Sequence, residues 1–283
     1  MKKKTMQIIS NILSFLKKTK VEEISNDNLK IRVCAKTDKG LIRYNNEDNY
    51  VYITNDDKST GLNISERGML FAIADGMGGH AAGEVASRIA CDSILTYYNF
   101  KKFKSSNIIS ILKNIFIKTN LDIINKSIYH SELSGMGTTL SVLVLINKTA
   151  LIAHIGDTRI YVIRNDDIQL LTKDHTEVQT ILDMGYITPE EAAVHSSRNV
   201  LTQAIGVDHN LDVFSNTFEI ECGDIFILTT DGLHDLITDE KIKKTILKNE
   251  NNIKNACDTL VELAIDEGGK DNITVIILKI IDL

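Results

Sequence analysis

Short runs of apolar residues, bounded by glycine, asparagine and aspartate, recur along most of this chain. Apolar runs between turn residues predict buried β-strands. The predicted strands cover residues 31–35, 49–53, 69–74, 140–146, 150–155, 160–164, 211–218, 225–230 and 273–281. Three of them, 140–146, 150–155 and 160–164, are joined by turns too short to hold a helix, so we expect these three to pair antiparallel.

A second pattern, with apolar residues three and four positions apart, predicts helices between these strands. The predicted helices cover residues 82–97, 108–129, 176–184, 239–248 and 253–264. Residues 55–68 are rich in turn-forming residues and predict a surface loop. From Leu29 onward the sequence shows neither an internal repeat nor a clear linker, which indicates a single domain.

The composition is that of an ordinary globular protein and narrows the classes of function. The chain has 283 residues, 43% of them hydrophobic and 25% charged, and a formal net charge of −6. This negative balance, without a basic stripe interleaved with aromatic residues, argues against nucleic acid as a partner. The cysteines, Cys34, Cys91, Cys222 and Cys257, are widely spaced, which favours reduced thiols in a cytoplasmic protein over disulfides or a zinc site.

Residues 1–28 differ in composition from the rest and predict a basic, amphipathic N-terminal extension. Six lysines fall within the first twenty residues, and Met6, Ile9, Leu13 and Leu16 share one helical face. The segment is too short and interrupted to cross a bilayer, which needs about 20 apolar residues. It is typical of weak peripheral contact between residues 1–20 and an anionic membrane, or of docking on a partner. A helix lying on its own domain, or a frayed terminus, fits the pattern somewhat better.

Acidic residues stand at the ends of several predicted strands. Asp75 and Asp231 directly follow apolar runs, and Asp48 and Asp271 stand just before others. In an antiparallel sheet the end of one strand lies beside the start of its neighbour. We therefore expect these four carboxylates on one rim, with Asp157 on a further hairpin nearby.

Carboxylates gathered in this way repel one another unless a cation binds. Two unit charges about 4 Å apart repel by about 4 kcal/mol at an effective dielectric constant of about 20. Clusters of oxygen ligands suit Mg²⁺ or Mn²⁺, and the chain lacks the paired His or Cys residues typical of zinc sites. Two such ions would form a hydrolytic centre, and the guanidinium of Arg43 would hold phosphate oxygens. A turn or a solvated loop end explains each acid alone, but not all of them together.

Seven short motifs occur in series from about Leu29 to Leu283, and together they are highly specific evidence of family membership. They are Arg43…Asn46-Glu47-Asp48, Asp75-Gly76-Met77-Gly78-Gly79-His80, Gly137-Thr138-Thr139, Gly156-Asp157-Thr158-Arg159, Arg198-Asn199-Val200-Leu201-Thr202, Thr230-Asp231-Gly232 and Asp271-Asn272. Each motif alone is weak evidence of function. On the whole series, the sequence resembles the metal-dependent protein serine/threonine phosphatases (the PPM, or type 2C, family) in their bacterial form.

The resemblance implies an α+β fold for residues 29–283, a four-layer α-β-β-α sandwich with two central antiparallel sheets. It implies that Asp75 bridges two ions, Mn²⁺ or Mg²⁺, and that Gly76 contributes its backbone carbonyl. Asp231 and Asp271 would hold one of these two ions.

Further site residues follow from the same resemblance. Asp48, with Glu47, would serve the second core ion directly or through water, and Asp157 would hold a third, weaker ion together with Asp231. Arg43 would bind the phosphate. Residues 173–197 correspond to a flap beside the site, which varies among relatives and influences the choice of substrate.

The implied activity is hydrolysis of phosphoserine and phosphothreonine in proteins by a water bridged between two divalent ions, without a phosphoenzyme. A catalytically silent phosphoprotein-binding regulator of the same fold is the alternative, and a nucleotide phosphodiesterase is a weaker one. The expected partners are phosphorylated proteins, such as a Hanks-type kinase and its substrates. We therefore expect a signalling enzyme that is monomeric and cytoplasmic.

One residue departs from the family pattern. Many eukaryotic relatives carry a histidine, a candidate general acid, where this chain has Met77. Since methionine cannot donate a proton, the proton for the leaving group must come from water or another group. His80, His154 and His175 are expected to be structural.

Overall fold

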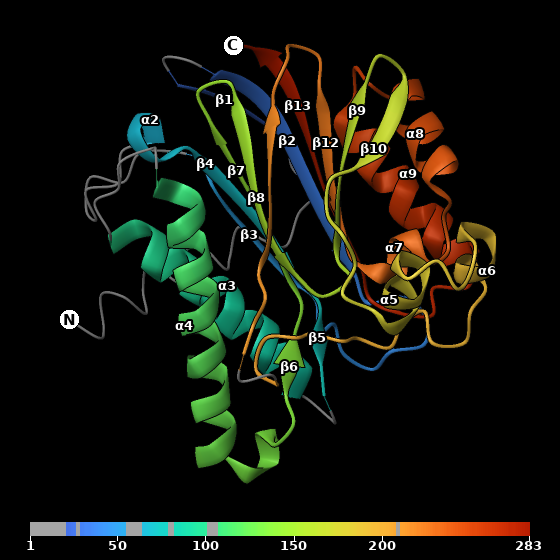
Figure 1. Cartoon of the computed structure of the whole chain (residues 1–283). Coiled ribbons are helices and arrows are strands. Elements are labelled where there is room, and N and C mark those ends of the chain that lie inside the picture. Colours follow the sequence, from blue (N-terminus) through green and yellow to red (C-terminus); the bar gives the residue numbers. More distant parts are fainter. Residues whose placement is uncertain (1–20, 27–28, 55–63, 79–81, 101–106, 208–209) are drawn as a thin grey trace.

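The computed structural model describes residues 21–26, 29–54, 64–78, 82–100, 107–207 and 210–283. Its described strands form two large antiparallel sheets and a short two-stranded ribbon (Figure 1). The first sheet has the order β1-β2-β13-β12-β9-β10, with β1 Glu22–Asn26, β2 Leu29–Asp38, β9 Arg159–Arg164, β10 Asp167–Leu170, β12 Ile225–Thr229 and β13 Ile273–Asp282. The second has the order β11-β8-β7-β4-β3, with β3 Asn49–Ile53, β4 Met69–Ala74, β7 Leu140–Ile146, β8 Thr149–Ile155 and β11 Phe214–Glu219. The ribbon pairs β5 Gly76–Met77 with β6 Gly137–Thr138.

Helices cover the outer faces of the two sheets. The long helices α3 (Ala82–Phe100) and α4 (Ile108–Tyr129) pack on the second sheet, and α8 (Asp239–Lys248) and α9 (Ile253–Asp266) pack on the first (Figure 1). The short helix α7 (Asp231–His234) follows β12. This arrangement confirms the predicted α-β-β-α sandwich with two central antiparallel sheets.

Strand β12 shows why so many strands are apolar at every position. Phe226 and Leu228 belong to the core between the sheets, whereas Ile225 and Ile227 belong to the core beneath α8 and α9. Successive side chains of a strand point to opposite faces, so a strand covered on both faces has no solvent-facing position. The sequence of such a strand is an unbroken apolar run rather than an alternation.

The connection after β8 contradicts one prediction. Strand β8 pairs with β7, but β9 pairs with β12 and β10 in the other sheet, so the three short runs do not pair in succession. Residues 156–158 therefore cross between the sheets and do not form the expected hairpin. Gly156 has a φ of +106°, and a Cβ there would lie 2.5 Å from Cγ2 of Thr139, so this crossing requires glycine.

Two further differences concern the first part of the chain. Strand β1, Glu22–Asn26, pairs with β2, so this part of the range 1–28 belongs to the first sheet. The amphipathic face predicted for residues 6–16 lies outside the described residues. Helix α2, Ile64–Arg67, lies within the predicted surface loop 55–68, where Ile64 is buried against the core.

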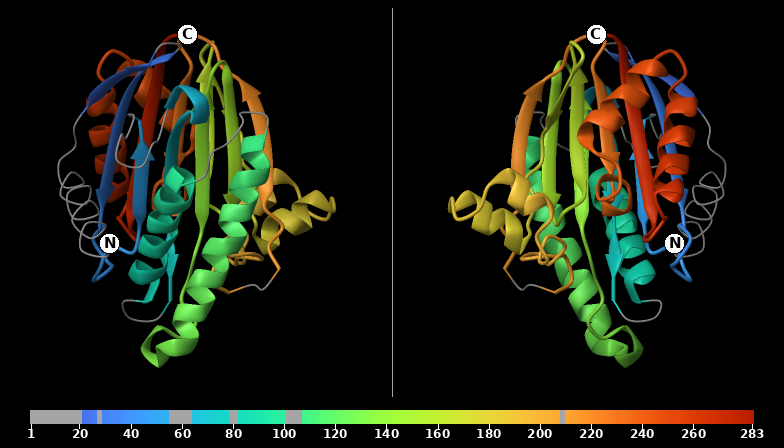
Figure 2. Two further views of the ribbon diagram at one scale, coloured as in Figure 1. Left: turned by 90° about the vertical axis from the view of Figure 1, so that its left-hand side faces the viewer. Right: turned by 90° about the vertical axis from the view of Figure 1, so that its right-hand side faces the viewer.

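The predicted flap, residues 173–197, contains two short helices that project beside the sheets (Figure 2). Helix α5 (Glu177–Asp183) matches the helix predicted at 176–184, and Thr176 caps it by accepting a hydrogen bond from the Gln179 N–H. Helix α6 (Pro189–Ala193) was not predicted, although Thr188 and Glu191 form the capping box that its sequence allows.

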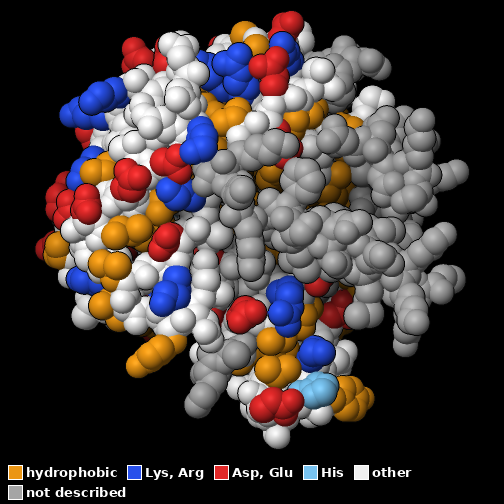
Figure 3. Space-filling model, turned by 180° about the vertical axis from the view of Figure 1, so that it is seen from behind, with side chains coloured by type: hydrophobic (Ala, Val, Ile, Leu, Met, Phe, Trp, Pro, Cys, Tyr) orange, Lys and Arg blue, Asp and Glu red, His pale blue; other side chains and the backbone are white. Residues whose placement is uncertain are grey.

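Among the described residues, no helix has both the length and the apolar character needed to span a bilayer. Seen from behind, the described part of the surface carries interspersed acidic and basic side chains with hydrophobic ones between them (Figure 3).

Candidate metal centre and active site

One cleft of about 490 Å³ brings the predicted site residues together. Its lining includes Arg43, Glu47, Asp75, Gly76, Asp157, Asp231 and Asp271. The cleft lies at the end of the sandwich where β4 and β12 end and β3 and β13 begin, so both sheets contribute carboxylates. The predicted rim of acidic residues therefore exists, and Asp157 reaches it from the crossing between the sheets.

Asp75 is held by its backbone, which leaves its carboxylate for the cleft. Its N–H donates to Oγ1 of Thr139 (2.9 Å), and its carbonyl accepts from Oγ1 of Thr138 (2.8 Å) and from the Thr139 N–H (2.9 Å). The next residue, Gly76, lies against other backbone segments, because a Cβ there would be 2.2 Å from the Gly83 carbonyl oxygen and 2.6 Å from that of Glu47. Only glycine fits this position.

Asp48 is buried beneath the cleft and is absent from its lining. Its Oδ2 accepts hydrogen bonds from Oγ1 of Thr230 (2.9 Å) and Oγ1 of Thr274 (2.6 Å), which belong to the other sheet's strand ends. Its Oδ1 is buried and has no hydrogen-bond partner among the described residues. Sequence reasoning missed both threonines, although Thr230 stands inside one of the motifs.

The two acids from the first sheet differ in their partners. Oδ1 of Asp231 is buried without a partner in the described part of the chain. Asp271 instead accepts a 2.5 Å hydrogen bond from Nη2 of Arg43, whose side chain is 53% exposed. The neighbouring Asn272 holds the loop before β3, since its Oδ1 accepts from the Glu47 N–H and its Nδ2 donates to the carbonyl of Asn45.

The electrostatics of the cleft are those of carboxylates that lack counter-charge. Burial, reinforced by repulsion from neighbouring aspartates, raises the pKa of Asp231 to about 6 and the pKa of Asp75 and Asp157 well above the usual range. Burial likewise raises the pKa of Asp48 to about 7, although its two threonine hydrogen bonds oppose the shift. The pKa of Glu47 is raised mainly by burial.

These residues fit a hard divalent cation. The donors are carboxylate oxygens, two of which are buried without partners among the described residues, and Gly76 lines the same cleft. Among the described residues, no group of three or more His, Cys, Asp or Glu side chains is placed so that it could hold a metal ion. Asp271 is paired with Arg43 in this structure.

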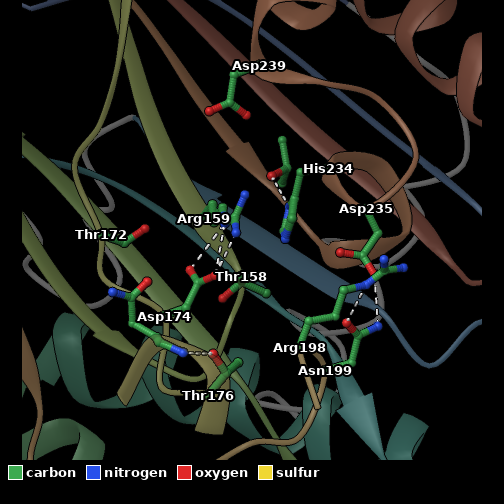
Figure 4. A network of polar contacts seen from close by, with 12 residues as sticks. Thr158, Arg159, Thr172, Asp174, Thr176, Arg198, Asn199, His234, Asp235 and Asp239 are labelled. Atoms are coloured by element: carbon green, nitrogen blue, oxygen red, sulfur yellow. Dashed lines mark hydrogen bonds and ion pairs between the residues drawn. The ribbon is translucent and has the colours of Figure 1, made fainter. Parts of the chain in front are cut away.

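A second cleft, of about 530 Å³, lies between the flap and helices α7 and α8, and it shares Asp157 and Asp231 with the first. Figure 4 shows the polar contacts around it. Arg159 donates three hydrogen bonds of 2.7–3.2 Å to Asp174 at the base of the flap. On the opposite side, Nδ2 of Asn199 donates to Asp235 (2.8 Å). These contacts fasten both ends of the flap to the domain.

Two of the expected structural histidines lie away from the main cleft. His154 is fully buried, with its Nδ1 2.7 Å from Oγ of Ser141, and its ring stacks on that of His175 with centroids 5.1 Å apart. Nδ1 of His175 accepts from the Gly156 N–H (3.1 Å). Both rings therefore support the crossing that carries Asp157, whereas His80 lies outside the described residues.

Comparison with known proteins agrees with this geometry. The family profile described as Protein phosphatase 2C matches residues 51–261. The chain is 34% identical to the serine/threonine protein phosphatase PstP of Mycobacterium tuberculosis over 90% of its own length, but it spans only 46% of that protein. It is 35% identical to the protein phosphatase PhpP of Streptococcus pneumoniae, covering 86% of this chain and 95% of PhpP.

A solved structure extends the comparison to the metal. The crystal structure of the catalytic domain of PstP in complex with two manganese ions superposes with a TM-score of 0.75 at 33% identity, covering 89% of this chain and 99% of that one. The matched profile, the level of identity and the common fold together show that this chain belongs to the protein phosphatase 2C family.

Proposed function

We propose that this chain is a protein serine/threonine phosphatase that hydrolyses phosphoserine and phosphothreonine with divalent metal ions. The observation that carries the proposal is a single cleft that combines four aspartates and Glu47, most of them with raised pKa values, with the exposed guanidinium of Arg43. The relatives named above as phosphatases favour a catalytic role over the alternative of a silent phosphoprotein-binding regulator.

The metal ligands are assigned as part of the proposal. Asp75 would serve both core ions, Gly76 would contribute its backbone carbonyl, and Asp231 and Asp271 would hold one ion. Asp48 lies behind the cleft and would act on the other ion through water, or through its unpartnered Oδ1. When bound, two such ions activate water and stabilise the charge of an in-line displacement. Mn²⁺ and Mg²⁺ both suit these oxygen ligands.

Three further residues complete the assignment. Glu47 lines the cleft beside the core acids, and Asp157 would hold a third ion together with Asp231. Arg43 has a planar fork that matches two phosphate oxygens, so we infer that it leaves Asp271 and binds the phosphate when metal occupies the carboxylates. Attack by water is direct, without a phosphoenzyme, and Met77 at the cleft wall leaves the leaving-group proton to solvent.

The cellular setting is inferred from the same activity. Phosphorylated proteins are the substrates, and a Hanks-type kinase with its targets would supply them, which places the enzyme in signalling as a cytoplasmic monomer. The basic residues 1–20 would add weak, peripheral contact with anionic membrane.

The test is turnover of a phosphoserine peptide in millimolar Mn²⁺, together with thermal unfolding. A ligand at about 100 times its Kd adds about 2.7 kcal/mol of stability, so Mn²⁺ should raise the Tm by about 5 °C or more. In Asp75→Asn, activity and most of this Tm shift should disappear. The stability of the metal-free protein should hold or rise, because burial makes the Asp75 carboxylate unfavourable in the folded state.

Asp167→Asn provides the matched control, since Asp167 is an exposed acid on β10 that is absent from the lining of the cleft. It should keep both activity and the metal response. An Asp75→Asn protein that still hydrolyses phosphopeptide and still responds fully to Mn²⁺ would refute the proposed function. Preferred turnover of a cyclic dinucleotide would instead assign a phosphodiesterase.

A further inference from the structure

Three exposed apolar residues lie next to Arg43 along the chain. Leu41 is 64% exposed, Ile42 66% and Tyr44 97%, and they are the chain neighbours of Arg43 on both sides. Single exposed apolar residues are common on protein surfaces and need no explanation. Three within four positions, next to a side chain that lines the cleft, are a local concentration of exposed apolar residues beside it. We call Leu41, Ile42 and Tyr44 the arginine rim.

The loop that presents the arginine rim is fixed at several points. The Leu41 N–H donates to the Gly269 carbonyl (2.8 Å), and Nδ2 of Asn272 donates to the carbonyls of Lys39 and Asn45 (2.9 Å each). Gly40 has a φ of +72° and lies so close to the turn before β13 that a Cβ would be 2.3 Å from the Asp271 carbonyl oxygen. A backbone held in this way presents its apolar side chains in one place, so little ordering entropy is lost when a partner covers them.

Apolar side chains also line the cleft itself. Leu201, Ala204 and Val207 line it, and Val207 is 51% exposed. A Cβ on Gly137 would lie 2.7 Å from both Cε of Met77 and Cγ2 of Val207, so both side chains lie close against Gly137. The cleft that holds the carboxylates thus has apolar lining residues of its own, in addition to the arginine rim beside Arg43.

We propose that the arginine rim is the docking surface for apolar or aromatic residues next to the phosphorylated residue of a protein substrate, an inference that rests on the proposed function. Consecutive α-carbons are about 3.8 Å apart, so the backbone positions of Ile42 and Tyr44 lie within about 4 Å of that of Arg43. A substrate strand that presents its phosphate to Arg43 brings its neighbouring side chains over them. The rim residues are the chain neighbours of Arg43, which lines the cleft and would bind the phosphate, so the phosphorylated substrate is the occupant that we assign to them.

The experiment compares two phosphoserine peptides that differ only at the positions flanking phosphoserine, leucine and phenylalanine in one and serine in the other. p-Nitrophenyl phosphate serves as a substrate without flanking residues. Each is tested, in saturating Mn²⁺, with the full chain and with Leu41→Ser, Ile42→Ser and Tyr44→Ser. Ile128→Ser is the matched control, because Ile128 is 69% exposed on helix α4 and lines none of the described clefts.

The full chain should favour the apolar peptide over the serine peptide in kcat/KM. Each rim variant should lower the ratio of kcat/KM for the apolar peptide to that for p-nitrophenyl phosphate about tenfold, the size expected for losing most of one buried apolar contact. Ile128→Ser should leave that ratio unchanged. Measuring the Tm of every variant separates a loss of docking from a loss of folding.

Equal kcat/KM for the two peptides, or equal ratios in the rim variants and the full chain, would overturn the inference while leaving the proposed function intact. A rim variant that changes only the sedimentation coefficient would assign the surface to self-association and would also overturn it. Loss of all phosphatase activity in the full chain would overturn the proposed function itself.

Discussion

Gly232 offers the sharpest test of how backbone spacing sets the site. It follows Asp231 in the first turn of α7, and a Cβ there would lie 2.0 Å from the carbonyl oxygen of Asn272 and 2.9 Å from its carbonyl carbon. Both of these atoms belong to the backbone beside Asp271, so they cannot rotate away. In Gly232→Ala the two segments must therefore separate, which moves the Asp231 and Asp271 carboxylates apart.

The size of this effect follows from the distances. Carbon–oxygen contacts are ordinarily about 3.3 Å or longer, so the segments must separate by about 1.3 Å. Overpacking of this kind costs about 1–3 kcal/mol of stability. A displacement of about 1 Å in a catalytic group costs about 100-fold in rate, so kcat/KM should fall by about that factor while the protein stays folded.

The assay measures kcat/KM on a phosphoserine peptide across a Mn²⁺ titration, together with the Tm. Gly223→Ala is the control, since Gly223 stands at the opposite end of β12 with a φ of +94° and no heavy atom within 4 Å of an added Cβ. A side chain in that conformation costs about 1–2 kcal/mol through backbone strain alone. The two variants should therefore lose similar stability but differ about 100-fold in activity. Equal activities would refute the view that the contact between Gly232 and Asn272 sets the spacing of the acids.

Three further predictions address the proton, the N-terminal segment and a buried ion pair. Met77→His should create a general-acid limb, in which the rate on phenyl phosphate esters falls as pH rises above about 6.5, the usual pKa of histidine, whereas such a limb already present in the wild type would show another general acid. A chain that starts at Val21 should float less with anionic liposomes at low salt than the full chain, and equal flotation would exclude membrane contact by residues 1–20. Asp224→Ala should cost about 2–3 kcal/mol in urea unfolding with kcat/KM unchanged, because Asp224 is buried against Arg164 (2.6 and 2.7 Å). This loss of stability is smaller than that expected for a fully buried ion pair, because the Arg164 side chain is 25% exposed. An Asp224→Ala protein with full stability but lost activity would contradict this prediction.

Local patterns in the sequence were sufficient for most elements and for the placement of the acids. Strands β3 and β7 and helix α4 have the predicted bounds, because each is a strong periodic or apolar segment closed by polar residues. The rim of carboxylates was predictable since Asp75 and Asp231 interrupt the chain where buried strands stop. Both predictions depend on burial, which the sequence encodes locally.

Pairing between distant segments was not predictable in the same way. An apolar run shows that β9 is buried but not which sheet contains it, so the crossing at residues 156–158 was mistaken for a hairpin. Asp48 was expected at the cleft because it precedes a strand, yet Thr230 and Thr274 hold it beneath the cleft. These threonines are far from Asp48 in the sequence, and a lone hydroxyl in an apolar strand gives no sign of its partner.

The position of β13 has a consequence for biosynthesis. This strand comes last in chain order but lies between β2 and β12 in the first sheet, where it pairs with both. As the ribosome makes the protein, β2 can pair with β1 and β12 with β9, but the strand that joins these two pairs is absent until residues 273–282 arrive. The first sheet therefore cannot close, and Asp271 cannot meet Asp75 and Asp231, before synthesis of the domain is almost finished. Under the proposed function, a nascent chain would therefore gain phosphatase activity only after the whole domain has been translated.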